Sequence, residues 1–462
     1  AGGNAGAVTV NRGLVTQALL KTTGDESNGL TVQSIGGGGG NAGMNIGISL
    51  NGSAGDSQPK QVSIGIGGSG GAAGIGGDVT VNQKGNIETY GDRSDALFAQ
   101  SIGGGGGNAN INIVGGINKD ATGVNVAVGG GTGDGGKGGI VIVHHTGNIT
   151  TEGNDSGAIF AQSVGGGGGN TRTSTAVAVK SKNAINVGIG RMGGTGADGG
   201  DVTVTSDGIL TTKGDRSVGI LAQSVGGGGG KSGTLAIGAK ATQGSGDEAQ
   251  AGSAGIQVGL KGGDSGIGGA VLVETSGSIT TGGQGSHAIF AQSVGGGGGI
   301  GGGVLTPVIK ENFSARVGVG GEGGTGSDAG IVTVKNKATL TTTGAAAAGI
   351  AAQSTGGGGG TGGQIIQVTL ASGGEGKDNN SGSVNIGGKG GEGANGKKVW
   401  VTNSGLITTT GKDSFGIQAR SVGGGGGDGG LVFTGTLALK GNSNSLEMAV
   451  GGEGGKGGTG GM

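Results

Sequence analysis

The chain has 462 residues, and 134 of them are glycine, about four times the ordinary usage. Only 31% of the residues are hydrophobic, 2% are aromatic and 12% are charged, which excludes a conventional close-packed globular domain. Collagen is excluded as well, because a collagen triple helix needs glycine at every third position and abundant proline. This chain instead has runs of five glycines and only two prolines.

Charge and cysteine content narrow the classes of function further. The formal net charge is −1, with acidic and basic residues scattered along the chain, so we expect no nucleic-acid partner, which would require a basic surface. There is no run of 18 apolar residues, and we expect no direct membrane insertion by this segment. Cysteine is absent, which excludes disulfides, thiolate metal ligands and cysteine nucleophiles.

One unit recurs seven times along the chain. Its most regular part is a hydrophobic pair, Ala-Gln-Ser, one more hydrophobic residue and five glycines. Close copies lie at 97–107, 159–169, 220–230 and 289–299, and looser copies at 30–40, 350–360 and 417–427. We predict a single elongated repeat array over residues 1–462, a fragment of a longer array. Its approximate units are 7–69, 70–139, 140–200, 201–269, 270–330, 331–397 and 398–462.

Each unit contains five short stretches with β-branched residues. In chain order these are Val-x-Val (as at 79–81), a threonine-rich stretch ending in glycine (149–153), the Ala-Gln-Ser stretch, and two alternating stretches after the pentaglycine (111–113 and 124–128). Alternation broken by glycine, asparagine and aspartate predicts strands and turns. A second glycine-rich stretch, such as 129–139, closes the unit. Helix is nearly excluded, because glycine in a helix interior costs about 1 kcal/mol relative to alanine.

Such short strands cannot fold alone, because ordering each residue costs roughly 1–2 kcal/mol of conformational entropy. Stacked copies would supply the missing partners, with equivalent strands pairing from unit to unit. We therefore predict an all-β parallel β-helix, or β-solenoid, with one variable loop or hairpin per repeat. Three geometries stay open: two coils per unit, for a rod of ~67 Å; one large coil per unit, for ~34 Å; or an antiparallel hairpin that projects from the solenoid.

The repeated string resembles a known class of repeats. Val-x-Val, then Gly-Asn-Ile-x-Thr-x-Gly or a near variant, then a strand such as Ile-Phe-Ala-Gln-Ser-Val leading into five glycines, is similar to the glycine-rich repeats in passenger regions of bacterial autotransporter adhesins. The resemblance covers all seven units but not the variable loops. It implies a secreted right-handed β-helix that a C-terminal outer-membrane β-barrel carries to the cell surface, with an extracellular or bacterial outer cell-surface location.

The Ala-Gln-Ser strand supplies three candidate columns. The amide column consists of Gln33, Gln100, Gln162, Gln223, Gln292 and Gln353, with Arg420 in the last copy. The serine column consists of Ser34, Ser101, Ser163, Ser224, Ser293, Ser354 and Ser421. The apolar stripe consists of Phe98, Phe160, Leu221 and Phe290. Either this stripe is simply exposed, or the glycine-rich segments or another chain cover it, in which case the amides form a buried column that needs partners. For the pentaglycines we expect close backbone approach within the stack.

Catalytic, metal and cofactor sites are not indicated. His287 and the pair at 144–145 fall at variable positions, where we expect exposed side chains, and no zinc-type spacing occurs. The pentaglycines do not continue into Gly-Lys-Ser/Thr, so a phosphate loop is excluded. The stretch 193–201 resembles a calcium-binding nonapeptide, but it occurs once per unit with inconsistent aspartates. We therefore expect no cofactor and leave calcium in the glycine-rich turns as an alternative. A carbohydrate-active enzyme would need paired carboxylates and aromatic platforms, which the repeats lack.

The expected function is therefore non-enzymatic. The first hypothesis is a bacterial cell-surface or extracellular structural protein, an adhesin stalk that mediates attachment or cell–cell contact, with the variable loops 51–60 and 374–382 as the contact points for a surface receptor or polysaccharide. The alternative is a self-assembling extracellular fibre or biofilm-matrix filament whose copies pack through glycine-rich faces.

Overall fold

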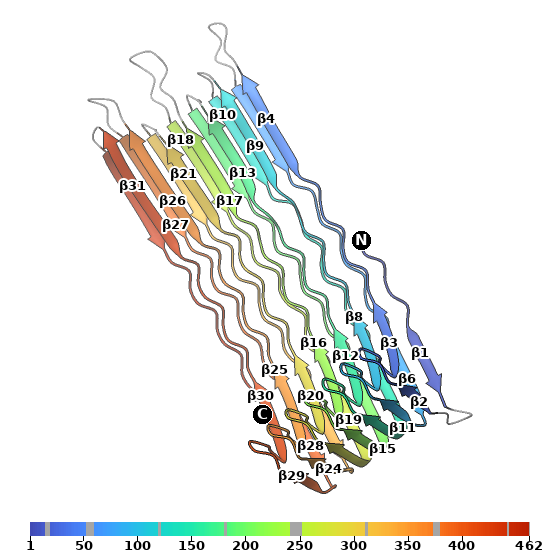
Figure 1. Ribbon diagram of the computed structural model, residues 1–462. Coiled ribbons are helices and arrows are strands. Elements are labelled where there is room, and N and C mark those ends of the chain that lie inside the picture. Colours follow the sequence, from blue (N-terminus) through green and yellow to red (C-terminus); the bar gives the residue numbers. More distant parts are fainter. Residues whose placement is uncertain are drawn as a thin grey trace.

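The chain forms an elongated solenoid of short parallel strands (Figure 1). The computed structural model describes residues 1–13, 19–51, 60–118, 122–179, 183–240, 252–309, 313–372, 379–440 and 443–461. Over these residues the chain consists of strands, turns and extended glycine-rich segments, without an α-helix. All ladders are parallel, which confirms the predicted all-β solenoid.

The proximal part of the solenoid contains two sheets, A and B. The main path of sheet A is β1 (Val8–Arg12), β6 (Val79–Lys84), β11 (Val141–Thr151), β15 (Val202–Thr212), β19 (Val271–Thr281), β23 (Val332–Asn336) and β28 (Val399–Asn403). The short strands β2 (Leu20–Thr22), β7 (Ile87–Thr89), β24 (Thr339–Thr342) and β29 (Ile407–Thr409) extend it. Sheet B contains the Ala-Gln-Ser strands β3 (Leu30–Ile35), β8 (Leu97–Ile102), β12 (Ile159–Val164), β16 (Ile220–Val225), β20 (Ile289–Val294), β25 (Ile350–Thr355) and β30 (Ile417–Val422).

The distal part contains the other two sheets, C and D, each of seven strands. Sheet C contains β4 (Asn45–Asn51), β9 (Asn112–Asn118), β13 (Ser174–Val179), β17 (Leu235–Lys240), β21 (Val304–Ile309), β26 (Ile365–Ser372) and β31 (Val432–Lys440). Sheet D contains β5 (Lys60–Ile66), β10 (Thr122–Val128), β14 (Asn183–Ile189), β18 (Gly252–Val258), β22 (Phe313–Val319), β27 (Asn379–Ile386) and β32 (Ser443–Val450).

Each sequence unit forms one large coil, here called a rung. In the second rung the chain runs through β6, β7 and β8, an outgoing glycine segment (103–111), β9, β10 and a return glycine segment (129–140). Strands β9 and β10 each pair in parallel with their counterparts in neighbouring rungs. Of the three geometries left open, one coil per unit is therefore correct. Seven rungs at ~4.8 Å per rung give a stack about 34 Å long. Two coils per unit and an antiparallel hairpin are wrong.

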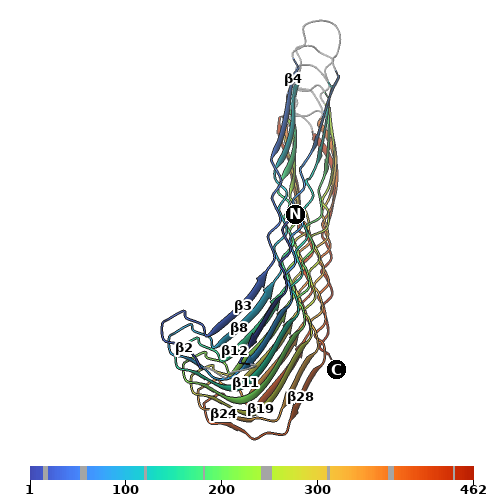
Figure 2. The ribbon, with the colours of Figure 1, turned by 90° about the vertical axis from the view of Figure 1, so that its right-hand side faces the viewer.

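The proximal part holds the main hydrophobic core, and its residues follow the alternation read in the sequence. Val79, Val81 and Leu97 are fully buried, as are their equivalents in the inner rungs. The polar side chains between them point outward, so one face of each strand lines the coil. In Figure 2 this part forms a hook, from which two long layers extend to the distal sheets.

Between the proximal and distal parts, the outgoing and return glycine segments form two hydrogen-bonded layers. Within the outgoing layer, the N–H groups of Gly103 and Gly106 donate to carbonyls of the next rung. Gly104 bonds across to the return layer instead, donating to Gly74 and accepting from Gly136, each at 2.9 Å. This three-residue period without bonds inside a segment is that of the polyproline II helix. The glycine section is therefore a two-layer lattice of extended glycine helices rather than a β-ladder.

Two of every three positions in the lattice face inward, and nearly all of them are glycine, with alanine at a few, such as Ala109, Ala197 and Ala394. A Cβ on Gly103 would lie 1.7 Å from the carbonyl oxygen of Gly136, and one on Gly104 would lie 2.2 Å from that of Gly37. A Cβ on Gly105, the third position, would meet nothing closer than 3.9 Å. The expected close backbone approach is thus confirmed for the inward positions, whereas the outward column (Gly38, Gly105, Gly167, Gly228, Gly297, Gly358 and Gly425) has room for a side chain.

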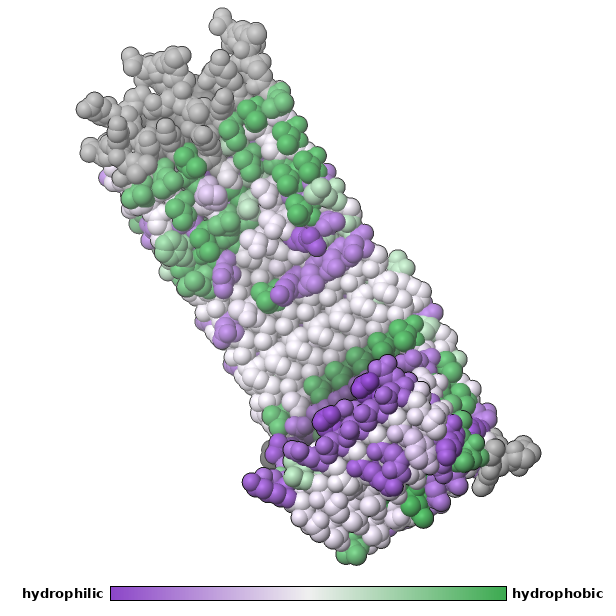
Figure 3. All heavy atoms as spheres, in the orientation of Figure 1, coloured by the Kyte–Doolittle hydropathy of each residue, from purple (hydrophilic) through white to green (hydrophobic). Residues whose placement is uncertain are grey.

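In the distal part, sheet D reverses the usual distribution of polar and apolar side chains. In β10 and β14, Asn125 and Asn186 lie fully buried between sheets C and D, and the side-chain Nδ2 of Asn125 donates to the side-chain Oδ1 of Asn186 at 3.0 Å. The valines and isoleucines of the same strands point outward. Among the described residues, the buried apolar side chains of this part come mainly from sheet C and include Val114, Leu235, Ile237, Val304, Val308 and Ile365. Exposed apolar side chains cover the outer face of sheet C in Figure 3.

Candidate functional site

The serine column closes each coil where sheet B meets the return layer. Ser163 lies at the end of β12 and is fully buried. Its Oγ donates to the carbonyl of Gly139 at 2.8 Å and accepts from the N–H of Gly200 at 2.8 Å. Ser101 makes the same pair of bonds, to Gly77 and Gly139. Each hydroxyl therefore links two successive return segments by accepting an N–H from one and donating to a carbonyl of the other. The repeat pattern alone does not reveal this role.

The glutamine column forms an outward amide ladder. Gln33 donates to Gln100 at 3.0 Å, Gln100 to Gln162 at 2.6 Å and Gln162 to Gln223 at 2.5 Å. The ladder continues through Gln292 to Gln353. The inner side chains are half-buried, so the partners that a buried amide column would need are the neighbouring glutamines. Arg420 ends the column with an exposed side chain.

The apolar stripe lies on the same outer face of sheet B. Phe98 and Phe160 stack with ring centroids 4.7 Å apart, and Leu221 and Phe290 continue the column in register. These side chains are half-buried because neighbouring rungs cover one another's flanks. In chain order the glycine segments follow the strands of sheet B, and cover of the stripe by them stays a prediction. Cover by another chain stays a prediction as well.

Two histidines are not the exposed side chains that the sequence predicted. His145 is 2% exposed, because β11 continues without a break past Val143 and places every second side chain inside the coil. Its Nδ1 lies 3.1 Å from the Ser206 hydroxyl, and Nε2 has no partner within the described part of the chain. Burial lowers the pKa of His145 to about 4.

His287 is half-buried at a turn. Its Nδ1 accepts the N–H of Ala348 at 2.9 Å, and its ring stacks on Phe290 with centroids 5.6 Å apart. Burial lowers its pKa. Both histidines therefore have structural contacts, and neither faces a cavity with a second catalytic group.

One carboxylate has an unusual environment. Asp95, in the turn before β8, accepts the N–H of Gly157 at 2.6 Å. Burial raises its pKa to about 6, against the lowering effect of that hydrogen bond, and the charge of Asp155 raises it further. The equivalent side chain in the first rung is Asn28, whose oxygen accepts the N–H of Asp95 at 2.8 Å. Gly157, Val218, Ala348 and Phe415 occupy the same position in other rungs, so the fold requires neither a charge nor a side-chain acceptor there.

The turns carry a column of charged residues in the left-handed backbone region. Glu26, Arg93, Asp155 and Arg216 have φ of 52–55°, and they alternate in sign from rung to rung. Arg93 Nη2 lies 3.1 Å from Glu26, and Arg216 Nε lies 2.6 Å from Asp155. The bond from Arg216 lowers the pKa of Asp155. All four side chains are solvent-accessible, so each pair adds little stability, but the alternation favours the correct register.

The two outer faces of the glycine section differ in charge. On the return face the outward positions recur every third residue and carry many charged side chains, such as Asp134, Lys137 and Asp198, with Lys137 and Asp198 2.8 Å apart. On the outgoing face the bare glycine column lies beside a column of valine and isoleucine and a column rich in asparagine. Figure 3 shows this face as a pale band between a green row and a purple row.

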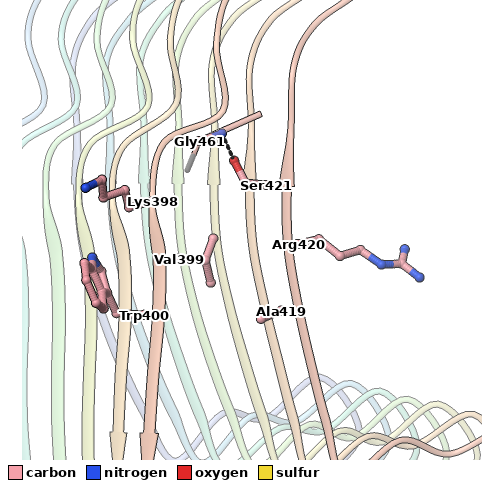
Figure 4. A pocket seen from close by; sticks show the side chains of 7 residues that line it. All are labelled: Lys398, Val399, Trp400, Ala419, Arg420, Ser421 and Gly461. Carbon is pink, nitrogen blue, oxygen red and sulfur yellow. Dashed lines mark hydrogen bonds between the residues drawn. The ribbon is translucent and has the colours of Figure 1, made fainter. Parts of the chain in front are cut away.

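A hollow of about 350 Å³ lies at the last rung, beside β28 and β30 (Figure 4). Lys398, Val399, Trp400, Ala419, Arg420, Ser421 and Gly461 line it. Trp400 is 58% exposed, and Ser421 accepts the Gly461 N–H at 2.6 Å, the same closure that every rung makes. Arg420 points away from the other lining residues. The hollow is thus the open end of the repeated lattice and not a built site.

No metal-binding cluster is present in the described ranges, where no three His, Asp or Glu side chains gather. Of the aspartates in the calcium-like stretch 193–201, Asp198 pairs with Lys137, and Asp201 accepts the N–H of Ala270 at 2.7 Å. Both already have partners in neighbouring rungs. Within the described residues no helix has the length and hydrophobicity needed to cross a bilayer.

Comparison with known proteins adds no assignment. No family model, no curated protein and no solved structure matches this chain.

Proposed function

We propose that this chain is a non-enzymatic structural protein of the bacterial cell surface or extracellular space, the stalk of an autotransporter-type adhesin that mediates attachment or cell–cell contact. The observation that supports this best is the separation of constant and variable parts. The seven rungs keep their register apart from one shift at the distal end of the β26–β31 ladder, while the connectors between the C and D strands differ in length. The strand ends that flank these connectors lie together at the distal edge (Figure 1).

A repeat that stays constant in its core and varies at one edge is suited to hold contact segments away from a surface. The connectors 51–60 and 374–382, predicted as contact points, lie mostly outside the described residues, but their flanking strands fix where they leave the solenoid. A surface receptor or a polysaccharide is the proposed partner. The hydrogen-bonded glycine lattice would act as the spacer between the proximal core and these connectors.

The test exchanges connectors without changing the rungs. In the variant, residues 52–59, 241–251 and 373–378 are each replaced by the three-residue connector 180–182, and both chains are displayed on a non-adherent bacterium. We expect attachment to host cells or immobilised polysaccharide to fall, while circular dichroism and the melting temperature of the purified chain stay unchanged. Equal attachment by both chains, or none by the unaltered chain, would contradict the proposal.

The second candidate is a self-assembling extracellular fibre or biofilm-matrix protein that packs through glycine-rich faces. The observation that favours it is the outward glycine column, which stays bare in all seven rungs although a Cβ on Gly105 or Gly425 would fit. A triple variant, Gly105→Lys, Gly167→Lys and Gly228→Lys, would obstruct such packing. If this function is correct, electron microscopy shows filaments of the unaltered chain and none of the variant; a chain that stays dispersed at high concentration rejects it.

A further inference from the structure

The outer face of sheet D is a continuous apolar surface. Three outward positions in each of its seven strands form a grid, because the rungs are in register. Its members are Val62, Ile64, Ile66, Val124, Val126, Val128, Ile185, Val187, Ile189, Ala254, Ile256, Val258, Ala315, Val317, Val319, Gly382, Val384, Ile386, Leu446, Met448 and Val450. None is charged or polar, and none is buried.

The side chains on the inner side of sheet D do not explain why its outer face is apolar. Asn125 and Gln257 are at most 2% exposed inside the distal part, and the oxygen of Asn125 and the amide nitrogen of Gln257 have no hydrogen-bond partner among the described residues. Burying polar groups inside while leaving aliphatic groups in water is unfavourable on both sides of the sheet. The arrangement therefore indicates that the outer face is covered when the protein functions.

The size of the face matches one half of a protein–protein interface. Seven strands at ~4.8 Å and about six residues at ~3.3 Å give a patch of about 34 Å by about 20 Å, or roughly 700 Å². Exposed apolar patches on monomers rarely exceed a few hundred Å², whereas standard interfaces bury about 800 Å² on each partner. Polar residues border the grid, among them Lys261 and Glu322 on the glycine side and Asn183 on the distal side, as in the rim of an interface.

We propose that the outer face of sheet D is the interface through which two copies of this chain pair laterally, face to face. This pairing is independent of the stalk function and uses the opposite side from the bare glycine column. A groove of about 450 Å³ follows the small residues Ala254, Ala315 and Gly382. Beside it runs the ridge formed by Ile256, Val317, Val384 and Met448, which also lines it.

A second copy suits this face better than another partner for two reasons. The grid has no charge, so an identical face does not repel it. Ridge and groove repeat at the same rung spacing on both copies, which lets the ridge of one copy enter the groove of the other, and two sheets pack face to face at about 10 Å. The outer face of sheet C is less suited, since it includes Thr175, Pro307 and the glycines at 115 and 238.

A matched pair of variants tests the interface. Val384 and Val368 occupy the centre columns of sheets D and C in the same rung, and each is 37% exposed. In sedimentation equilibrium we expect the unaltered chain and Val368→Lys to be dimers at micromolar concentration. For Val384→Lys we expect the dissociation constant to rise roughly 100-fold or more, because the lysine would be buried unpaired. Circular dichroism melts show whether both variants fold equally.

A cysteine scan locates the contact directly, since the chain contains no cysteine. Ile256 is the centre of the grid, so a two-fold axis through the patch places Ile256→Cys next to its own counterpart. We expect mild oxidation to link Ile256→Cys into a covalent dimer and to leave Val368→Cys monomeric. A monomeric unaltered chain, equal weakening by both lysine variants, or binding of phosphatidylcholine vesicles by the sheet D face in place of dimerisation would overturn the proposal.

Discussion

The hydroxyl of Ser163 bridges two successive return segments. It donates to the carbonyl of Gly139 at 2.8 Å and accepts the N–H of Gly200, which lies one rung further along the chain. This side chain continues the backbone hydrogen bonding of the return layer across the point where that layer meets sheet B. The proximal core and the glycine lattice are therefore coupled through one buried hydroxyl per rung.

Removing this hydroxyl should destabilise the solenoid locally. Ser163→Ala leaves a buried carbonyl and a buried N–H without partners, and we expect the free energy of unfolding in urea to fall by about 2 kcal/mol. Ser276→Ala serves as a control, because it removes an exposed bond to Asp207 and should change stability by less than about 0.5 kcal/mol. Equal losses in the two variants would show that the Ser163 bridge is not structurally important.

Adjacent glycines in the lattice should respond oppositely to alanine. In Gly104→Ala the new Cβ would meet the Gly37 carbonyl oxygen at 2.2 Å, and we expect a loss of about 3 kcal/mol or failure to fold. In Gly105→Ala the Cβ points to solvent, so we expect no loss, and a gain of up to about 0.5 kcal/mol because the unfolded chain loses freedom. Thermal unfolding measures both, and similar effects would contradict the three-residue period.

The alternation of apolar and polar residues was sufficient to predict the strands of the proximal part. Val79, Val81 and Leu97 lie in the core because β-branched and aliphatic residues repeat at every second position in all rungs, the same alternation that predicted these strands. The same alternation carried a signal that was missed at His145, which follows Val141 and Val143 at the inward spacing. Treating it as a turn residue led to the wrong prediction of exposure.

The glycine section was harder to predict, although its period is visible in the sequence. Asp134, Lys137 and Ile140 recur every third residue among glycines, which is the outward period of an extended glycine helix. The distal part was not predictable from alternation at all, because a period of two does not say which face is inside. Asn125 is buried and Val126 points outward, which is the opposite of what their polarity alone would predict.

Acid should weaken the fold through His145. Its pKa is about 4 in the folded chain and 6.5 ordinarily, so between these values the unfolded state binds a proton that the folded state does not. Stability is therefore complete above pH 6.5 and falls by as much as about 3 kcal/mol as the pH drops to 4. His145→Gln, which places the residue type of Gln83 in the same column, should lose this dependence. If urea titrations of the two chains fall in parallel with pH, His145 is not responsible.

Asp95 should act in the opposite direction over nearly the same pH range. Its folded pKa of about 6 lies above the ordinary 3.8, so between these values the folded state binds the extra proton, and stability falls as the pH rises from 4 to 6. At pH 7 the buried charge costs as much as about 3 kcal/mol. Asp95→Asn keeps the acceptor for the Gly157 N–H, as Asn28 does for Asp95. We therefore expect this variant to be more stable than the parent at pH 7 and equal to it at pH 4. A variant that is less stable at pH 7 would show that the carboxylate charge contributes favourably, contrary to its burial.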